Sequence, residues 1–350
     1  MRILTVSHSW QGANDYSFVR AFRRAGHSVL VVSDQDFVPN GLRNRGLRLA
    51  RRVILPLLVD DYQTALLDAA TRFKPDLLFI YKGTYVKAET IARIKRLGTT
   101  AINVYPDIGF SSQSPYLEAA MAQYDAVFTT KSFRISYMKD KLGVQNVAFM
   151  PHAFDPEVHF PLPLEADERT RYASDVAFIG TWSPKKGALL EHLRQRLPDI
   201  DLKIWGNQWE RASPVLAGSL QGGSLLGVEY TKGIQAAKIV LASLVESAAD
   251  STQGDKTTSR TFEIPAVGSF MLHERTEEAK SYFAEGSECD MFGSNDELVE
   301  KVRHYLSNDR ERELIAEAGH LRARRSGYSY DDRISTILQA VRELRAVEAR

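Results

Sequence analysis

Two neighbouring lysines, Lys185 and Lys186, lie in a stretch whose residue types suit an anion. They come shortly after the apolar run 176–179 and open a helical pattern. An ammonium group beside the exposed N–H groups of a helix N-terminus attracts negative charge, and such N-termini commonly bind phosphate. We therefore expect this loop, with Gly180 and Thr181 at its start, to bind an anionic group.

A second segment combines hydroxyl groups with an arginine. Thr257, Thr258 and Ser259 precede a helical pattern that begins at Arg260. Their hydroxyl and N–H groups can also contact a phosphate. Helix capping explains the hydroxyls equally well, and an ordinary surface position is the alternative for Arg260.

Three residues of the first half are candidates for contacting a second ligand. Asp107 follows the run 100–104, at the end of an expected strand, and is our candidate general base or acceptor contact. A turn aspartate that caps the next segment is the alternative. Lys82 ends the preceding apolar run and faces the same rim. His152 follows the last run of this half, where it contacts a ligand or makes a structural hydrogen bond.

Several motifs with a defined chemistry are absent. Neither G-x-G-x-x-G, G-x-x-x-x-G-K-[ST] nor G-x-S-x-G occurs, so a dehydrogenase, a P-loop kinase and a serine hydrolase lose their main support. The histidines lack H-x-x-x-H and H-E-x-x-H spacing, and Asp-x-Asp triplets such as 34–36 and 199–201 are expected by chance. We predict no metal site.

The composition bounds the scaffold that positions these residues. The chain has 350 residues, 44% of them hydrophobic and 25% charged, which are ordinary globular values and suggest about two domains. A single cysteine, Cys289, excludes an internal disulfide and a cysteine zinc site and favours a reducing compartment. The net charge of +1 argues against a protein that binds nucleic acid.

Apolar, β-branched runs alternate with helical patterns throughout the chain. Strands that are apolar on both faces and alternate with helices are typical of parallel sheets covered on both sides. The predicted strands are 3–6, 28–33, 76–81, 100–104, 126–129, 147–150, 176–179, 202–204, 225–227, 239–244, 270–272 and 290–292. The predicted helices are 15–25, 60–73, 88–97, 115–123, 133–141, 186–196, 230–237, 260–267, 276–283, 296–306, 309–324 and 330–344.

A proline-rich break divides the pattern into two similar halves. Four prolines fall within residues 151–167 and interrupt any periodic element. Two α/β halves joined in this way predict a pair of Rossmann-like domains, with a cleft between them as the default site.

Several longer segments of the chain form a recognisable series. In the second half they are DVAFIGTWSPKKG (175–187), LKIWGNQW (202–209), AAKIVLASLVES (236–247), TSRTFEIPAVGSFMLHERTEE (258–278) and GYSYDDR (327–333). In the first half they are KPDLLFIYKG (74–83), NVYPD (103–107), YDAVFTTK (124–131) and PHAFDPEVHFP (151–161). Together they resemble GT-B-fold glycosyltransferases of group 1 (family 4-like), most closely the CgeB-type spore-maturation proteins, and the second half resembles their C-terminal domain. The resemblance implies an α/β fold of two Rossmann-like domains whose parallel sheets face across a cleft.

The resemblance also implies the order of the domains. An N-terminal acceptor domain would span 1–151, a linker 152–168 and a nucleotide-sugar-binding domain 169–328. The final helix, 329–350, would cross back to the N-terminal domain.

Two acids match the family's pair that flanks seven residues. By resemblance, Glu263 would pair with the ribose hydroxyls of the donor and Asp255 would approach its sugar. Aspartate instead of glutamate at the first position is a departure that shortens the reach. The alternatives are a helix N-terminal acid for Glu263 and a solvated loop acid for Asp255.

The donor's phosphates and base would meet further residues of the family pattern. Lys186 matches the diphosphate lysine, while Thr181 stands where the family often has an arginine. Lys185, Lys256 and Arg260 are candidates to replace that cation. By resemblance, Gly12 lies in a loop that faces the phosphates, and Trp205 and Gly206 lie near the nucleotide. A core position is the alternative for Trp205.

Three functions remain open on this evidence. The first is a metal-independent, retaining hexosyltransferase that needs no cofactor beyond its nucleotide-sugar donor and acts in polysaccharide or cell-surface glycan synthesis. Its acceptor would be a glycan, a lipid-linked hydroxyl or a small molecule, and Asp107 would be the base if it inverted. The second is an inactive scaffold that binds a nucleotide sugar or serves in assembly. The third is a GT-B-fold isomerase or phosphorylase.

The charge of the chain is unevenly distributed. Residues 1–52 carry nine arginines and no lysine against three aspartates, so this segment sums to +6 and the remainder to −5. The segment Arg43–Arg52 reads as a short basic amphipathic helix, which suits contact with an anionic membrane, or as an ordinary solvated face. No run approaches the ~20 apolar residues of a membrane span, and we expect a cytoplasmic protein.

Overall fold

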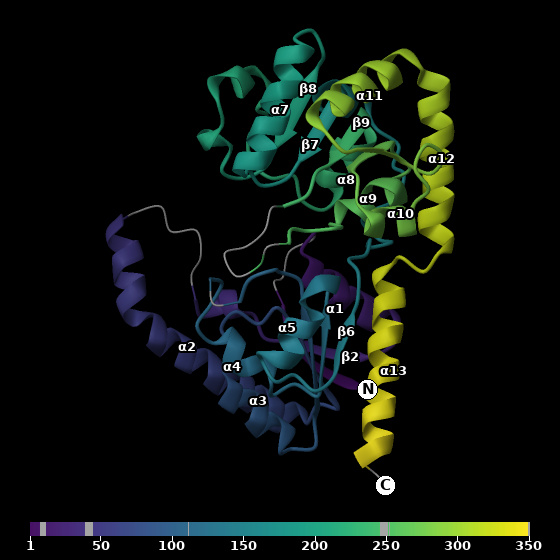
Figure 1. Ribbon diagram of the computed structural model, residues 1–350. Helices are drawn as coiled ribbons and strands as arrows, with labels where there is room; N and C mark the ends of the chain where they lie inside the picture. The colour runs from purple at the N-terminus through teal and green to yellow at the C-terminus, as the bar shows by residue number, and fades with distance from the viewer. Residues whose placement is uncertain (8–11, 39–44, 111, 246–250, 252, 349–350) are drawn as a thin grey trace. The chain divides into compact units, whose positions relative to one another are not determined.

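The computed structural model describes the whole chain except residues 8–11, 39–44, 111, 246–250, 252 and 349–350. The chain forms two compact units. Unit 1 consists of Met1–Pro151, Ala249–Ser251 and Asp331–Arg350, and unit 2 of His152–Ala248 and Thr252–Tyr330. Each unit contains one parallel sheet with helices packed against it (Figure 1).

The sheet of unit 1 has six strands in the order β2-β1-β3-β4-β5-β6. All neighbours pair in parallel, and every residue of β4 is buried, as expected for a strand covered on both faces. The strands are β1 (Arg2–Val6), β2 (Ser28–Val31), β3 (Leu77–Tyr81), β4 (Thr100–Tyr105), β5 (Ala126–Thr129) and β6 (Val147–Phe149). The helices of this unit's N-terminal part are α1 (Asn14–Arg24), α2 (Arg45–Phe73), α3 (Ala88–Lys95), α4 (Leu117–Met121) and α5 (Ile135–Asp140).

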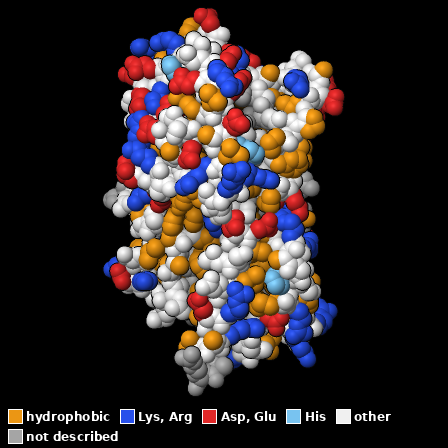
Figure 2. Space-filling view, turned by 90° about the vertical axis from the view of Figure 1, so that its right-hand side faces the viewer, with side chains coloured by type: hydrophobic (Ala, Val, Ile, Leu, Met, Phe, Trp, Pro, Cys, Tyr) orange, Lys and Arg blue, Asp and Glu red, His pale blue; other side chains and the backbone are white. Residues whose placement is uncertain are grey.

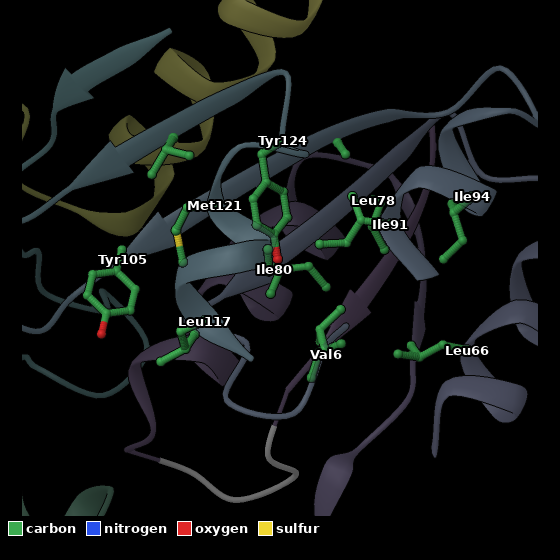
Figure 3. Close-up of a cluster of buried hydrophobic side chains, with 14 of the residues drawn as sticks. Val6, Leu66, Leu78, Ile80, Ile91, Ile94, Tyr105, Leu117, Met121 and Tyr124 are labelled. Atoms are coloured by element: carbon green, nitrogen blue, oxygen red, sulfur yellow. The ribbon is translucent and has the colours of Figure 1, made fainter. Parts of the chain in front are cut away.

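The core of unit 1 lies between its sheet and helices α2, α3 and α4 (Figure 3). Strand residues such as Leu78 and Ile80 meet Leu66 of α2, Ile91 of α3 and Met121 of α4. Periodic apolar residues thus bury one stripe of each helix against the sheet.

Helix α2 differs from the prediction at its N-terminal end. We expected a short basic helix at 43–52 and a separate helix from residue 60, but one helix runs from Arg45 to Phe73 and contains Pro56. Arg43 lies outside the described residues, as do the side chains of residues 45–50 and 52.

The last helix, α13 (Tyr330–Glu348), packs against unit 1. The Nε of Arg345 donates to Thr100 Oγ1 at 3.0 Å, and the Nε of Arg333 donates to the carbonyl oxygen of Pro151 at 3.0 Å. Arg24 of α1 forms an ion pair with Asp331 at 2.7 Å. Helix α12 (Asp309–Arg325) belongs to unit 2. Figure 2 shows acidic and basic side chains interspersed among hydrophobic and other ones on the surface.

The sheet of unit 2 has five parallel strands in the order β11-β10-β9-β7-β8. They are β7 (Ser174–Ile179), β8 (Leu202–Trp205), β9 (Ala237–Ala242), β10 (Met271–Glu274) and β11 (Asp290–Phe292). Two buried clusters, one around Phe262 and one around Phe178, form its core. The remaining helices are α6 (Ala166–Tyr172), α7 (Pro184–Arg196), α8 (Val228–Gln235), α9 (Arg260–Val267), α10 (Glu277–Tyr282) and α11 (Asn295–Ser307).

In the second half, one predicted strand is wrong and one helix was not predicted. Residues 225–227 form no strand: Gly227 has φ 55° and is the N-cap residue of α8, while Leu225 packs beside the core. The proline-rich stretch ends in a helix, α6, whose start carries a capping box between Glu165 and Glu168.

Candidate active site

The predicted anion-binding segments of unit 2 come together at the carboxyl edge of its sheet. Strands β7 and β9 are neighbours, and β10 pairs with β9, so the segments that follow them emerge at one edge. Helix α9 begins at the same edge with Arg260. This edge is where ligands bind in open α/β sheets.

Arg260 connects the ends of two strands. Its Nη1 donates to the carbonyl oxygen of Ile179 at 3.0 Å and its Nη2 to that of Ser243 at 3.2 Å. The guanidinium lies 5.4 Å from the ring centre of Phe178. A Cβ on Gly180 would lie 2.8 Å from Nη1, so glycine at this position leaves room for the guanidinium.

Lys186 brings a second cation to the same place. It is 5% exposed, and its Nζ donates to the carbonyl oxygen of Thr181 at 3.2 Å. Burial, and after it the charge of the nearby Arg260, lowers the pKa of Lys186 to about 8, against the opposing effect of Asp255. The ammonium therefore lies in a poorly solvated place where an anion would stabilise it.

The N-terminal turn of α7 is fixed by its own cap. Ser183 is the N-cap residue, and its hydroxyl accepts the backbone N–H of Lys186 at 3.4 Å. Lys185, by contrast, pairs with Glu274, whose other oxygen accepts the backbone N–H of Leu244 at 3.0 Å. Of the three candidate replacement cations, Arg260 is the one whose charge acts on Lys186 most strongly.

Glu263 lies one turn into α9 and is 7% exposed. Its Oε2 accepts the hydroxyl of Tyr230 at 2.6 Å, and the Nε2 of His159 lies 3.9 Å from Oε1. Burial raises the pKa of Glu263 to about 7, while the hydrogen bond from Tyr230 and the charge of Arg260 act in the opposite direction. The hydrogen bond from Tyr230 thus holds the carboxyl group in place. With this pKa, the group gains or loses its proton near neutral pH.

Asp255 is half-buried, and its backbone N–H donates to the carbonyl oxygen of Val245 at 3.1 Å. Its charge acts on Lys186, so the structure brings together Asp255, Lys186 and Arg260. Lys256 is held through its carbonyl oxygen, which accepts the hydroxyl of Thr276 at 2.7 Å.

The loops after β7 and β8 approach each other closely at Gly180 and Gly206. Gly206 has φ 146°, and a Cβ there would lie 2.0 Å from the carbonyl oxygen of Gly180. Trp209 Nε1 also donates to that oxygen at 2.8 Å. Trp205 is 5% exposed and packs in the core beside Tyr172, which is the core position named above as its alternative.

The start of α9 is tied to β10 by a buried hydrogen-bond chain. The N–H of Thr258 donates to Thr261 Oγ1 at 3.0 Å, and that hydroxyl bonds His273 Nε2 at 2.8 Å. Burial lowers the pKa of His273 to about 4, so the ring is neutral. Ser259 is the N-cap residue of α9 and makes no side-chain capping bond.

Sequence reasoning missed the partners of the site. Tyr230, His159 and His273 come from α8, from the segment before α6 and from β10, and no local pattern marks any of them. Only the pairing of distant segments brings them to Glu263 and Thr261.

In unit 1, Asp107 and Lys82 lie at the ends of neighbouring strands. Lys82 Nζ lies 2.6 Å from Asp107 Oδ2 and donates to Gln113 Oε1 at 3.0 Å. Gly12 is exposed with φ 94°, and the residues before it, 8–11, lie outside the described residues. His152 is buried and is the first residue of unit 2. Whether Asp107, Lys82, Gly12 and His152 contact a ligand stays a prediction.

No group of three or more His, Cys, Asp or Glu side chains within the described residues could hold a metal ion. The Asp34–Asp36 triplet forms a short 3-10 turn after β2. In the same part of the chain, no helix is both long enough and apolar enough to cross a membrane.

Part of the chain matches a known family. Residues 185–339 match a family model described as "Glycosyl transferase-like". No curated protein sequence matches the chain.

Solved structures resemble the chain over nearly its whole length. Sucrose-phosphate synthase from Thermosynechococcus elongatus has a TM-score of 0.70 at 12% identity, over 99% of this chain and 100% of that one. Anabaena HepE in complex with UDP and glucose has a TM-score of 0.64 at 13% sequence identity, over 97% of this chain and 100% of that one. A putative UDP-N-acetylglucosamine 2-epimerase from Listeria monocytogenes has a TM-score of 0.58 at 11% sequence identity, over 98% of this chain and 96% of that one. The predicted GT-B fold is therefore confirmed.

Proposed function

We propose that the protein is a glycosyltransferase that moves a sugar from a nucleotide-diphosphate donor to a hydroxyl acceptor. The observation that carries the proposal is the pair of cations, Lys186 and Arg260, beside the buried carboxyl of Glu263 at one sheet edge. All three residues fall within the region that matches the glycosyltransferase family model. The UDP-bound neighbour HepE supports a nucleotide-sugar donor.

The cations would stabilise the departing diphosphate. As the anomeric bond breaks, negative charge grows on the diphosphate, and preorganised cations with helix N–H groups lower the energy of that state. The ammonium group of Lys186 would be stabilised most, because the diphosphate takes the place of the water molecules that burial has removed from around it. Glu263 would accept hydrogen bonds from the ribose diol, and Asp255 would lie on the sugar side.

Several finer points belong to the same proposal. We infer metal-independent transfer with retention, in which a donor phosphate oxygen serves as base and Asp107 positions the acceptor. Asp107 would be the base in an inverting reaction. We also propose the hexosyl type, a CgeB-like subgroup and a role in polysaccharide or cell-surface glycan synthesis.

Nucleotide binding is the first test. Differential scanning with UDP, GDP, TDP and ADP should show a shift with at least one of them, and no shift with any would remove the donor site. Slow hydrolysis of the matching nucleotide sugar should then be lost in Lys186→Ala and Glu263→Ala. Lys238→Ala is the matched control, since this lysine pairs with Asp175 and is half exposed. Normal turnover in both site variants would refute the assignment.

An inactive scaffold is the competing function, and one observation favours it. Thr181 replaces the family's arginine, and Lys185 is neutralised by Glu274, so the diphosphate meets fewer free cations. Binding of a nucleotide without hydrolysis or transfer of its sugar would decide for the scaffold.

A peripheral contact with an anionic membrane is part of the proposal for the acceptor side. Val53, Ile54 and Leu57 of α2 are 74%, 45% and 66% exposed, next to the arginine-rich segment that ends at Arg52. Exposed apolar residues beside arginines suit an interface of anionic lipids. Vesicles with anionic lipid should bind the protein, and replacing Arg48, Arg51 and Arg52 with Glu should abolish binding. Equal binding of both proteins would exclude the contact.

A further inference from the structure

The hydrogen-bond chain between β10 and the start of α9 runs in one defined direction. His273 Nδ1 lies 2.6 Å from the carbonyl oxygen of Glu274. A carbonyl oxygen can only accept, so Nδ1 carries the ring proton. Because burial lowers the pKa of His273 to about 4, the ring is neutral near neutral pH and its Nε2 is an acceptor. The hydroxyl of Thr261 therefore donates to Nε2, at 2.8 Å.

This direction determines the role of the N–H of Thr258. The hydroxyl of Thr261 gives its one proton to His273, so its lone pairs are left to accept the N–H of Thr258 at 3.0 Å. A bond of the same kind, from a backbone N–H to the side chain three residues later, occurs in the capping box at helix starts. We call His273, Thr261 and the N–H of Thr258 the relay. Of the N–H groups expected to contact a phosphate, that of Thr258 is thus already bonded within the protein.

Two further hydrogen bonds hold the same turn against the segment that follows β10. The hydroxyl of Thr276 donates to the carbonyl oxygen of Lys256 at 2.7 Å, and the hydroxyl of Thr257 donates to Glu278 Oε1 at 2.9 Å. Thr257 is buried, as are both side chains of the relay. Hydrogen bonds inside a protein, away from water, are electrostatically stronger than exposed ones. The backbone of residues 256–258 is therefore fixed before any ligand binds.

The relay leaves a small set of donors at this turn for a ligand. The N–H groups of Ser259 and Arg260 bond to no acceptor within the described part of the chain. Among the same residues, the Nε of Arg260 and the hydroxyl of Ser243 are buried without a hydrogen-bond partner. Buried polar groups are nearly always paired, so these two groups point to a ligand or to water.

These donors can act on a diphosphate only while the turn keeps its place. Preorganised donors stabilise developing charge because they need no rearrangement at the moment of reaction. Arg260 follows Thr258 by two residues, so a shift of the Thr258 backbone also moves the N–H groups of Ser259 and Arg260. A displacement of about 1 Å can cost a large part of an enzyme's rate.

We propose that His273 and Thr261 are positioning residues for the diphosphate of the donor. Through the N–H of Thr258 they hold the turn that presents the N–H groups of Ser259 and Arg260. Both side chains are 0% exposed, so they act through the turn and not by touching the ligand. The inference rests on the proposed glycosyltransferase function and specifies what keeps its donor site in shape.

Inorganic pyrophosphate is a suitable probe, because it carries the diphosphate without a base or a sugar. Thr261→Val keeps the shape of the side chain and removes the hydroxyl, whereas Thr261→Ser keeps the hydroxyl. In calorimetric titration of the full chain, pyrophosphate binding should weaken about tenfold in Thr261→Val and stay within about threefold of the parent in Thr261→Ser. Thr99→Val is the matched control and should bind like the parent. This buried threonine of unit 1 also loses a bond to a backbone carbonyl, that of Pro75 at 2.9 Å.

Two measurements follow the relay without any ligand. The amide of Thr258 should exchange with solvent about tenfold faster in Thr261→Val than in the parent, and at the parent's rate in Thr261→Ser and Thr99→Val. Nitrogen NMR of the imidazole should show the ring proton of His273 on Nδ1. A ring proton on Nε2 would reverse donor and acceptor at Thr261 and would overturn the proposal.

A second pair of variants protects the test against poor folding of Thr261→Val. His273→Leu removes the acceptor of the Thr261 hydroxyl and should weaken pyrophosphate binding about three- to tenfold. His273→Gln offers an amide oxygen as acceptor and should stay within about threefold of the parent. Unchanged affinity in Thr261→Val or His273→Leu, an equal loss in Thr261→Ser or Thr99→Val, or no binding of pyrophosphate to the parent would overturn the proposal.

Pyrophosphate binding needs no turnover, so the assay separates the two proposals. Binding that depends on Thr261, with no turnover of any nucleotide sugar, would refute the transferase and leave the relay as the support of a diphosphate site. Turnover of a nucleotide sugar, together with pyrophosphate binding that ignores Thr261→Val, would refute the positioning role and leave the transferase.

Discussion

Replacing Lys186 with methionine should stabilise the protein while destroying its donor site. The change keeps the length of the side chain and removes the ammonium. Burial lowers the pKa of Lys186 from 10.5 to about 8, so at pH 7 the fold holds a proton that its surroundings disfavour. At about 1.4 kcal/mol per pKa unit, the charge costs up to roughly 3 kcal/mol.

The net gain will be smaller, because the bond from Nζ to the carbonyl oxygen of Thr181 is lost. We expect Lys186→Met to raise the free energy of unfolding by about 1–3 kcal/mol, or the melting temperature by about 2–4 °C for each kcal/mol. The sign follows from linkage. The folded pKa lies below the unfolded one, so the parent gains stability as the pH rises from about 8 towards 10.5, and the variant lacks this gain.

Calorimetric melting at pH 7 and pH 9.5 measures both effects. Lys238→Met, at a half-exposed lysine of the same unit, should leave stability within about 0.5 kcal/mol of the parent. Nucleotide binding should disappear in Lys186→Met and persist in the control. A destabilised Lys186→Met, or one that keeps full nucleotide affinity, would refute the idea of a cation held ready for an anion.

Three further outcomes follow from the same structure. Nucleotide affinity of the parent, measured by calorimetric titration, should fall about tenfold between pH 7 and pH 9 as the free Lys186 loses its proton, and a profile that stays flat would argue against its role. Gly206→Ala should cost several kcal/mol in denaturant unfolding, roughly as a severe core change does, because its Cβ meets a backbone oxygen. Gly222→Ala is the control, because Gly222 also has a positive φ, 108°, but open space around it, so this variant measures the cost of the backbone conformation without a clash. Equal losses of stability in the two variants would disprove the steric argument. In the parent, the hydrogen bond from Tyr230 lowers the pKa of Glu263, so Tyr230→Phe should raise that pKa above about 7. The acidic limb of the pH profile of hydrolysis should then move to higher pH. A limb that does not move would show that Glu263 is not the titrating group.

Much of the fold could be predicted because its strands are apolar on both faces. The runs ending at Tyr81 and Ile179 appear in the structure as β3 and β7 within a few residues of the predicted bounds. The failures are instructive. Residues 225–227 look like a strand by composition, but Gly227 takes a positive φ and starts a helix. The basic segment before residue 53 and the segment from residue 60 were predicted as two separate helices, but α2 is one helix that continues through Pro56, a residue type that usually interrupts helices.

The site was predictable where a local rule applied and not elsewhere. Lys186 follows a strand and opens a helix, so its place at the sheet edge follows from the order of elements. The burial of Lys186 does not follow from the order of elements, because it depends on Phe178 and Arg260, which belong to a strand and to another helix. The partner of Glu263, Tyr230, lies on a helix 33 residues earlier, and only packing joins them.

The assignment of α13 to unit 1 has a consequence for how the protein folds during synthesis. Unit 2 is formed by residues that lie between the two main parts of unit 1, so the ribosome completes unit 2 first. Until residues 331–348 emerge, Thr100 and the carbonyl of Pro151 lack the arginines that bind them. A fragment that stops at Pro151 should therefore be a poor substitute for unit 1, whereas a circularly permuted chain in which a linker joins α13 to Met1 would make unit 1 continuous.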